Sequence, residues 1–311
     1  MARQIQIAQT GGPEVLQVAE VEPRDPGPGE IRIANRAIGL NFIDIYIRSG
    51  LYPAELPSGL GTEGAGVVDA VGEEVEDFAE GDRVAYAMGP LGAYADFITM
   101  DADKAIALPE AIDFEAAAGG MLKGLTVQYL IRQTYAIGED DTILFHAAAG
   151  GVGSIACQWA HALGAHVIGT VSNEDKASIA HQNGAWMTID TTRESVPERV
   201  RELTDGAMVP VVYDSVGKDT CRFAGLSVQT WPDGQLRQCL GRGRGREPGR
   251  SQQGRLAVRY TAEPGRLCRH PRTLRDDVRR SVRGTRIRRG EDQYRPALRA
   301  RGRRPGPARI G

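Results

Sequence analysis

Between about residues 3 and 99, short apolar runs alternate with segments rich in Gly, Pro and Asp. The runs include IRIANRAIGL, GAGVVDAVG and DRVAYAM, and the intervening segments read PGPG, SGLGTEG and EEVEDFAEGD. Strands at short spacing with this turn chemistry predict a compact antiparallel barrel or sandwich. We expect no long helix to interrupt it.

From about Pro109 the hydrophobic pattern changes. The stretch PEAIDFEAAAGGMLKGLTVQYLIRQTYAI has apolar residues at helical spacing and many good helix formers. Four buried-type strands, DTILFHA, HVIGTV, WMTID and VPVVYDSVG, then alternate with helical segments. This alternation predicts an α/β fold with a parallel, doubly wound sheet.

The charge is divided unevenly along the 311 residues. Residues 1–221 carry 33 acidic and 14 basic side chains, a net charge of −19, whereas residues 222–311 carry 7 and 24, a net charge of +17. All 24 basic residues of the second part are Arg. Its low content of large apolar residues predicts a mostly disordered tail. The folded part therefore ends near residue 221.

Other features of the chain narrow its class. No apolar run is long enough to span a membrane, and no leader pattern opens the sequence. The four cysteines all lie at or after Cys157 and form no CxxC pair, which argues against a disulfide framework and a cysteine-rich zinc site. We expect a cytoplasmic protein with no membrane partner.

A glycine-rich turn follows the first of the four strands. The turn contains Gly150, Gly151, Val152 and Gly153 and is followed by a small residue, Ala156. In this strand–turn–helix context the glycines allow a tight turn and a close approach of a pyrophosphate, and the helix N-terminus favours the negative charge. The segment predicts a dinucleotide site, whereas a glycine turn used only for packing is the alternative.

The tip of the second strand indicates which dinucleotide binds. NAD-preferring sites place an Asp or Glu there, about 20 residues beyond the turn, to accept from the ribose 2′-hydroxyl. This chain instead has Ser172 and Asn173, followed one helical turn later by Lys176. Neutral donors and a cation suit a 2′-phosphate, so we expect NADPH rather than NADH. The alternative for Lys176 is a solvated helix charge.

Several longer motifs resemble one known family. TGGPEVL, GLNFIDIYIRSGLYP, GTEGAGVVDAVG, GDRVAY, MLKGLTVQYL and HAAAGGVGSIACQWAHALGAHVIGTV are similar to the NADPH:quinone oxidoreductases, the zeta-crystallin-like branch of the medium-chain dehydrogenase/reductases. The resemblance covers nearly all of residues 5–221. It implies a GroES-like catalytic domain over residues 1–125, a Rossmann domain over residues 126–221, a cleft between them and a homodimer.

The resemblance also implies roles for individual residues. Zinc-dependent relatives use Cys and Gly-His-Glu where this chain has Asn41 and Thr62, so we expect no metal site. Hydrogen-bond donors must then polarise the substrate, and the candidates are Asn41, Tyr46 and Tyr52. Lys123 and Thr126 are expected near the ribose and nicotinamide. The alternatives are packing for the tyrosines and a surface charge for Lys123. Thr191 stands where relatives often place a tyrosine beside the adenine.

After about Thr220 the resemblance stops. The family is expected to continue with two more Rossmann strands and an FGNxSG-like loop. Reading residues 231–241, 256–267 and 291–302 one base onward permits GPMVNFGNASG, SLYVTRPNLADY and KINIGQRYALAD, in the order the family requires. We therefore predict a frameshift near residues 219–222. The sheet would end after its fourth strand with an unpaired edge, and the chain as written would be marginally stable and poorly active.

The leading function is hydride transfer from NADPH to a quinone or another small electrophilic substrate, such as an activated alkene. The first alternative, from the same superfamily, is reduction of 2-enals or enoyl thioesters. Two alternatives from other classes remain. One is a non-catalytic NADPH-binding remnant, and the other is a polyanion or nucleic-acid binder acting through the Arg-rich tail. Since the tail lacks interleaved aromatic residues for base stacking, we expect no selected nucleic-acid partner.

Overall fold

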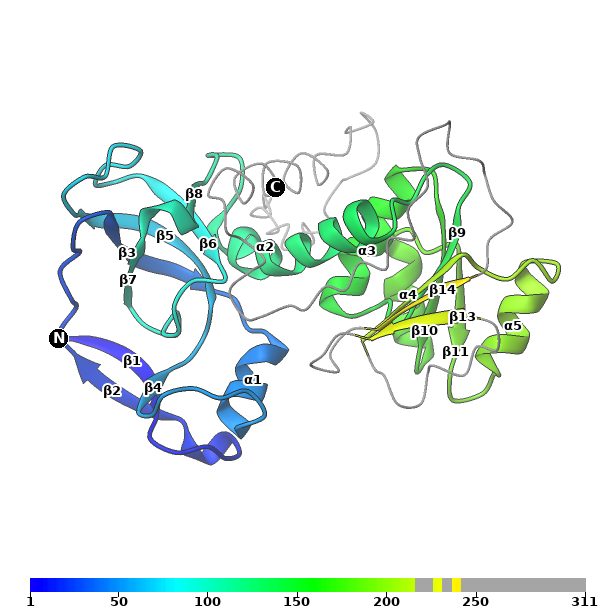
Figure 1. Cartoon of the computed structure of the whole chain (residues 1–311), viewed down its shortest axis with the longest axis horizontal. Helices are drawn as coiled ribbons and strands as arrows, with labels where there is room; N and C mark the ends of the chain where they lie inside the picture. The colour runs from blue at the N-terminus through cyan, green and yellow to red at the C-terminus, as the bar shows by residue number, and fades with distance from the viewer. Residues whose placement is uncertain (216–225, 231–236, 242–311) are drawn as a thin grey trace, which may run out of the picture.

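The computed structural model describes residues 1–215 together with the backbone of residues 226–230 and 237–241. The described chain forms two lobes (Figure 1), the first made mainly of strands and the second of alternating strands and helices. No helix among these residues is long and apolar enough to cross a membrane. The α/β fold with a β-rich first domain is confirmed.

Two antiparallel sheets build the first lobe. The larger has the strand order β7-β3-β5-β6-β8, and the smaller has the order β2-β1-β4. Apolar side chains on the inner face of the larger sheet, including Ile31, Ile33, Val68 and Tyr86, are fully buried. The bounds of the strands are β1 (Ala2–Ile7), β2 (Gln17–Val21), β3 (Glu30–Ile38), β4 (Ser58–Gly59), β5 (Glu63–Val71), β6 (Arg83–Ala87), β7 (Phe97–Asp101) and β8 (Ala105–Ala107).

A short helix, α1 (Phe42–Ser49), interrupts the strands. It begins after Asn41, whose backbone N–H donates to the Asp44 carboxylate over 2.8 Å. It ends at Gly50, which has a φ of 82°, a conformation that glycine adopts without strain. One face buries Ile47 against the core below the smaller sheet. The sequence pattern excluded a long helix here and did not predict this one of eight residues.

The long helix α2 (Phe114–Tyr129) leads from the first lobe to the second and continues into a π-helical turn, Leu130–Thr134. It begins at Asp113, whose carboxylate accepts from the Ala116 N–H over 2.6 Å, a typical N-cap. The predicted boundary between residues 125 and 126 falls inside this helix and stays a prediction. Because α2 contacts both β5 and α3, it joins the two lobes.

The second lobe is a sheet with the strand order β11-β10-β9-β12-β14-β13. The first four strands are parallel, and helices lie on both faces (Figure 1), which confirms the doubly wound pattern. The bounds are β9 (Thr142–Phe145), α3 (Gly151–Ala162), β10 (His166–Val171), α4 (Glu174–Gln182), β11 (Met187–Asp190), α5 (Val196–Leu203), β12 (Val211–Asp214), β13 (Leu226–Thr230) and β14 (Arg237–Gly241).

The expected unpaired edge after the fourth strand is wrong. Strand β14 pairs antiparallel with β12, so that Val211 lies opposite Leu240 and Asp214 opposite Arg237, and β13 pairs with β14. The physical reason lies in the sequence, since LSVQT and RQCLG are short segments with apolar residues. Their backbone N–H and C=O groups can pair with those of an exposed edge strand. The rest of the predicted tail lies outside the described residues.

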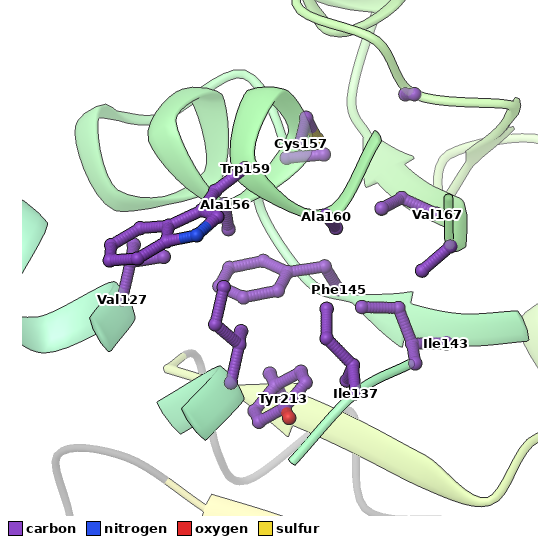
Figure 2. Close-up of a cluster of buried hydrophobic side chains, with 14 of the residues drawn as sticks. Val127, Ile137, Ile143, Phe145, Ala156, Cys157, Trp159, Ala160, Val167 and Tyr213 are labelled. Atoms are coloured by element: carbon purple, nitrogen blue, oxygen red, sulfur yellow. The ribbon is translucent and has the colours of Figure 1, made fainter. Parts of the chain in front are cut away.

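The core of the second lobe forms around Phe145 at the end of β9 (Figure 2). Its ring lies 5.3 Å from that of Tyr213 on β12, centroid to centroid, and α3 covers it with Ala156 and Ala160. The Tyr213 hydroxyl donates to the carbonyl oxygen of Leu130 over 3.2 Å. This contact ties the sheet to the end of α2, so the lobe-joining helix has a fixed position on the sheet.

Candidate functional site

The glycine turn lies where the sequence places it, between the end of β9 and the start of α3. Gly150 is the N-cap of α3, and Ala147 before it adopts a left-handed φ of 53°. A Cβ on Gly153 would lie 2.5 Å from the carbonyl oxygen of Ala147 and 2.6 Å from that of Ala148. Only glycine therefore lets the first turn of α3 pack on the strand exit.

The neighbouring Gly151 has a different environment. A Cβ there would meet only the flexible side chain of Lys123, 2.9 Å from its Cδ and Cε. The Lys123 stem thus lies across Gly151. Val152 is half-buried and packs on the core of the second lobe. The turn leaves backbone accessible beside Lys123, and such an arrangement fits a phosphate-bearing group.

The three residues at the tip of β10 form a cluster of their own. The Lys176 ammonium donates to the Ser172 hydroxyl over 2.9 Å. The Asn173 side-chain oxygen accepts from the Lys176 backbone N–H over 2.9 Å and caps α4. The other polar group of the Asn173 side chain is its amide nitrogen. All three residues are exposed, so a cation and a hydroxyl lie together at the strand tip. On the adjacent strand, the Thr191 hydroxyl donates to the Val171 carbonyl.

A second cluster joins the two lobes at the start of α1. The Asn41 amide nitrogen donates to Glu63 Oε2 over 2.7 Å, and the Lys123 ammonium donates to Asn41 Oδ1 over 3.0 Å. The backbone N–H of Leu122 donates to the other Glu63 oxygen over 2.6 Å. The ammonium of Lys123 also lies 3.7 Å from Glu63 Oε2. The structure therefore brings together Asn41 and Lys123, which the sequence analysis assigned separately.

Glu63 is the residue of this cluster that sequence reasoning missed. It opens β5 in the GTEG motif and is fully buried. Burial raises the pKa of its carboxyl, although the N–H donors of Asn41 and Leu122 and the charge of Lys123 oppose that rise. The available signal was a charged residue directly before the apolar run GAGVVDAV.

Tyr46 on α1 and Tyr52 just after it lie together, and both are half-buried. Their ring centroids are 5.9 Å apart in an edge-to-face arrangement, and the Tyr46 ring also lies 6.4 Å from that of Phe42. Phe42 and Leu40 are among the most exposed apolar side chains of the described residues. Tyr52 also packs against the core that includes Ile47, so part of its role is packing. The aromatic side chains form an apolar surface next to Asn41.

Two further residues, Thr126 and His146, lie near the site. Thr126 is one turn beyond Leu122 on α2, and its hydroxyl donates to the Leu122 carbonyl oxygen over 2.9 Å. His146, which the sequence analysis did not select, is buried at the end of β9. Its Nδ1 lies 3.0 Å from the Thr170 hydroxyl, and its Nε2 has no hydrogen-bond partner. Burial lowers the pKa of this imidazole.

The described residues contain no group of three or more His, Cys, Asp or Glu side chains that could hold a metal ion. Asn41 and Thr62, which the family resemblance placed at the metal-ligand positions of zinc-dependent relatives, are both buried.

Two family models match the chain. The Alcohol dehydrogenase GroES-like domain matches residues 27–110, and the Zinc-binding dehydrogenase matches residues 151–230. A quinone oxidoreductase of Pseudomonas aeruginosa is 64% identical over 221 residues, covering 71% of this chain and 68% of that protein. A 2-haloacrylate reductase of a Burkholderia species is 47% identical over 220 residues, covering 69% of this chain and 66% of that protein.

Solved structures agree. The crystal structure of Escherichia coli quinone oxidoreductase complexed with NADPH is 57% identical, with a TM-score of 0.69 over 70% of this chain and 67% of that one. A GroES-like domain followed by a Rossmann sheet with a glycine turn defines a medium-chain dehydrogenase/reductase. Within that class, the chain belongs to the quinone oxidoreductase family. The resemblance stated from the sequence motifs is thereby confirmed.

Proposed function

We propose that this chain is an NADPH-dependent quinone oxidoreductase that reduces a quinone or another small electrophilic substrate without zinc. The observation that carries the proposal is the position of Lys123. Its ammonium contacts Asn41 at the first lobe, and its stem lies across Gly151 at the nucleotide turn of the second. One side chain thus connects the predicted substrate side with the predicted cofactor side.

The cofactor side is assigned from three features. Ser172 and Lys176 at the tip of β10 hold the 2′-phosphate that distinguishes NADPH from NADH, because an exposed cation and a hydroxyl suit a phosphate. The glycine turn with Gly150, Gly151 and Gly153 faces the pyrophosphate at the N-terminus of α3. The Escherichia coli relative was solved with NADPH, which supports this choice.

The substrate side orients the acceptor and stabilises charge. When bound, NADPH supplies the hydride. The apolar surface of Phe42, Tyr46 and Tyr52 suits a flat, conjugated acceptor such as a quinone ring. Hydroxyl donors of the two tyrosines, the second amide hydrogen of Asn41 and the Lys123 ammonium are the groups that stabilise negative charge developing on the acceptor oxygen. Thr126 lines the cofactor side of α2 by resemblance.

The first test is binding and turnover. Purified protein is titrated with NADPH and NADH while nucleotide fluorescence is followed, and then assayed with 1,4-benzoquinone. We expect tighter binding of NADPH and NADPH oxidation that depends on the quinone. Equal affinity for the two nucleotides would contradict the cofactor choice, and NADPH binding without turnover would favour the non-catalytic remnant.

A single substitution tests the 2′-phosphate site. Lys176→Ala removes the exposed cation at the β10 tip, and charge-assisted hydrogen bonds contribute about 1.5–3 kcal/mol before solvent screening reduces them. We expect about tenfold weaker binding of NADPH and unchanged binding of NADH, measured by fluorescence titration. Lys104→Ala, which removes an exposed lysine of the first lobe, is the control. A parallel loss for both nucleotides would refute the assignment.

Reduction of an activated alkene is the second candidate. The observation that favours it is the 2-haloacrylate reductase, which is 47% identical to this chain. Comparing kcat/KM for 1,4-benzoquinone, 2-chloroacrylate and a 2-enal with the same enzyme preparation separates the candidates. A preference for the quinone supports the leading proposal.

We extend the proposal to the whole protein in three respects. Residues 1–125, 126–221 and 222–311 are a catalytic domain, a truncated Rossmann domain and a frameshifted tail. In support, the alignments with three bacterial quinone oxidoreductases each span 221 residues. The enzyme works in the cytoplasm, and with its frame restored it forms a homodimer. Sequencing of the gene across codons 215–225 tests the shift, because an extra or missing base there is required.

A further inference from the structure

The cluster at the lobe junction is centred on a carboxylate that the proposed chemistry does not use. Glu63 is fully buried, whereas the Lys123 side chain remains 21% exposed. Both Glu63 oxygens are occupied, one by the Asn41 amide and the other by the Leu122 backbone N–H. These partners come from the start of α1 and from α2, so one carboxylate fixes two elements.

This arrangement determines how the Asn41 amide is oriented. Because its nitrogen donates to Glu63, its oxygen is the atom left to face the Lys123 ammonium, at 3.0 Å. A neutral amide in place of the carboxylate has one acceptor oxygen for the two N–H donors of Asn41 and Leu122, so that orientation would no longer be fixed. Without an ordered Asn41 oxygen and a negative charge 3.7 Å away, the ammonium of Lys123 loses two of its interactions.

The position of the Lys123 stem then depends on the same carboxylate. The stem lies across Gly151, and the nearby Leu40 carbonyl is a long 3.5 Å from the ammonium. We propose that Glu63 is a positioning residue, which acts through Asn41 and Lys123 to hold the Lys123 side chain beside the nucleotide turn. The inference rests on the proposed function, since it assigns Lys123 to the cofactor side of that site.

Removing a buried charge that positions another side chain should weaken nucleotide binding, whereas removing one that stabilises the fold should lower the free energy of unfolding. Burying a carboxylate is unfavourable unless its partners compensate fully. Glu63→Gln keeps the shape and removes the charge, so a positioning role predicts weaker NADPH binding without a matching loss of stability. Glu115→Gln is the control, because it removes the same charge by the same substitution at an exposed position in the first turn of α2.

The first experiment is a double-mutant cycle on NADPH affinity. Glu63→Gln is expected to raise the Kd for NADPH about tenfold, the size of one charge-assisted interaction, while the urea midpoint stays at or above that of the wild type. In a Lys123→Met background, Glu63→Gln is expected to change the Kd less than about twofold. An equal loss in both backgrounds, or a loss matched by a lower midpoint, overturns the proposal.

The second experiment needs no cofactor. The chain has four lysines, and Lys104 is exposed and paired with Asp101, which makes it an internal reference. Limited acetylation with mass spectrometry gives the rate at Lys123 relative to Lys104. Release of the ammonium in Glu63→Gln is expected to raise this ratio several-fold, whereas an unchanged ratio overturns the proposal. If the wild type does not bind NADPH, the proposed function fails, and this ratio still decides the role of Glu63.

A conservative variant guards against misfolding. If Glu63→Gln does not fold, Glu63→Asp is compared instead, since it keeps the charge and shortens its reach by one methylene. We expect the ratio of acetylation at Lys123 to that at Lys104 to be higher in Glu63→Asp than in the wild type. A ratio equal to that of the wild type then contradicts positioning by Glu63.

Discussion

The buried carboxyl of Glu63 should make the stability of the fold depend on pH. Burial raises the pKa of its carboxyl above that of an unfolded chain, so the folded state holds a proton that the unfolded state has released. Its stabilising contribution is therefore present at low pH and is lost as the pH rises through the raised pKa. Glu63→Gln, which does not titrate, should gain stability relative to the wild type over that rise.

Urea unfolding of both proteins at several pH values between about 4 and 8 measures this difference. As the pH increases, the stability of the wild type should decrease relative to that of the variant. If the stability of the wild type instead rises relative to that of the variant with increasing pH, then Lys123 and the two N–H donors overcome the cost of burying the carboxylate. Lys123 can be rehydrated in the variant because its side chain is partly exposed.

Cys157 is a second residue whose environment determines its reactivity. Cys157 is a residue of α3, its thiol is fully buried in the core of the second lobe (Figure 2), and burial raises the pKa of this thiol to about 12. Only about one thiol in 10⁴ is then ionised at pH 8, compared with roughly a quarter of an ordinary cysteine. Iodoacetamide should therefore label Cys157 at least about 10³-fold more slowly in native protein than in urea, as measured by peptide mass spectrometry. Rapid native labelling would show that α3 opens readily.

At the scale of elements, two helical glycines should respond oppositely to the same substitution. A Cβ on Gly153 would press on the carbonyl oxygens of Ala147 and Ala148, whereas a Cβ on Gly119 of α2 would meet nothing within 4 Å. We expect Gly153→Ala to destabilise the fold by about 1–3 kcal/mol through overpacking. Gly119→Ala should stabilise it by up to about 1 kcal/mol, because alanine favours helix more than glycine does.

Urea midpoints of the two variants, measured beside the wild type, decide this comparison. If Gly153→Ala is as stable as the wild type, α3 has room to move away from the end of β9, and the turn glycine is then free of the packing constraint.

The elements show where sequence reasoning is strong and where it fails. The alternation of strands and helices from β9 to β12 was readable because each buried strand and amphipathic helix has its own period. Helix α1 was not readable, since FIDIYIRS is rich in β-branched residues that suit a strand. Its helical state is stabilised locally by the Asp44 carboxylate at its start and by Gly50 at its end, together with burial of Ile47.

At the scale of the whole molecule, the site residues divide in a similar way. Gly151, Gly153 and Lys176 follow from motifs in which spacing along the chain carries the chemistry. Glu63 could not be found in this way, because its proposed role arises from hydrogen bonds to Asn41 and Leu122, which lie 22 and 59 residues away in the sequence. The charge and composition of residues 222–311 marked them as different, yet the pairing of β14 with β12 was not foreseen.

The divided charge supplies the last prediction. Residues 222–311 carry a net charge of +17, and all of their basic residues are Arg. Residues 1–221 carry a net charge of −19. Such a basic segment binds polyanions by releasing counterions, so the chain as written should bind a heparin column at low salt and elute as salt rises. Sequence-independent DNA binding with the same salt dependence would follow from composition alone.

A gene corrected by one base near codons 219–222 provides the comparison. It replaces the Arg-rich segment with the continuation that the family resemblance implies, while leaving the preceding residues unchanged. We expect the corrected protein to lose heparin binding and to gain kcat/KM for NADPH-dependent quinone reduction by at least about tenfold, because the family resemblance implies that the restored continuation carries a loop facing the nicotinamide and so helps to position the reactants. Equal activity of the two proteins would mean that residues 1–221 already hold a sufficient site, and the frameshift proposal would then have no functional support.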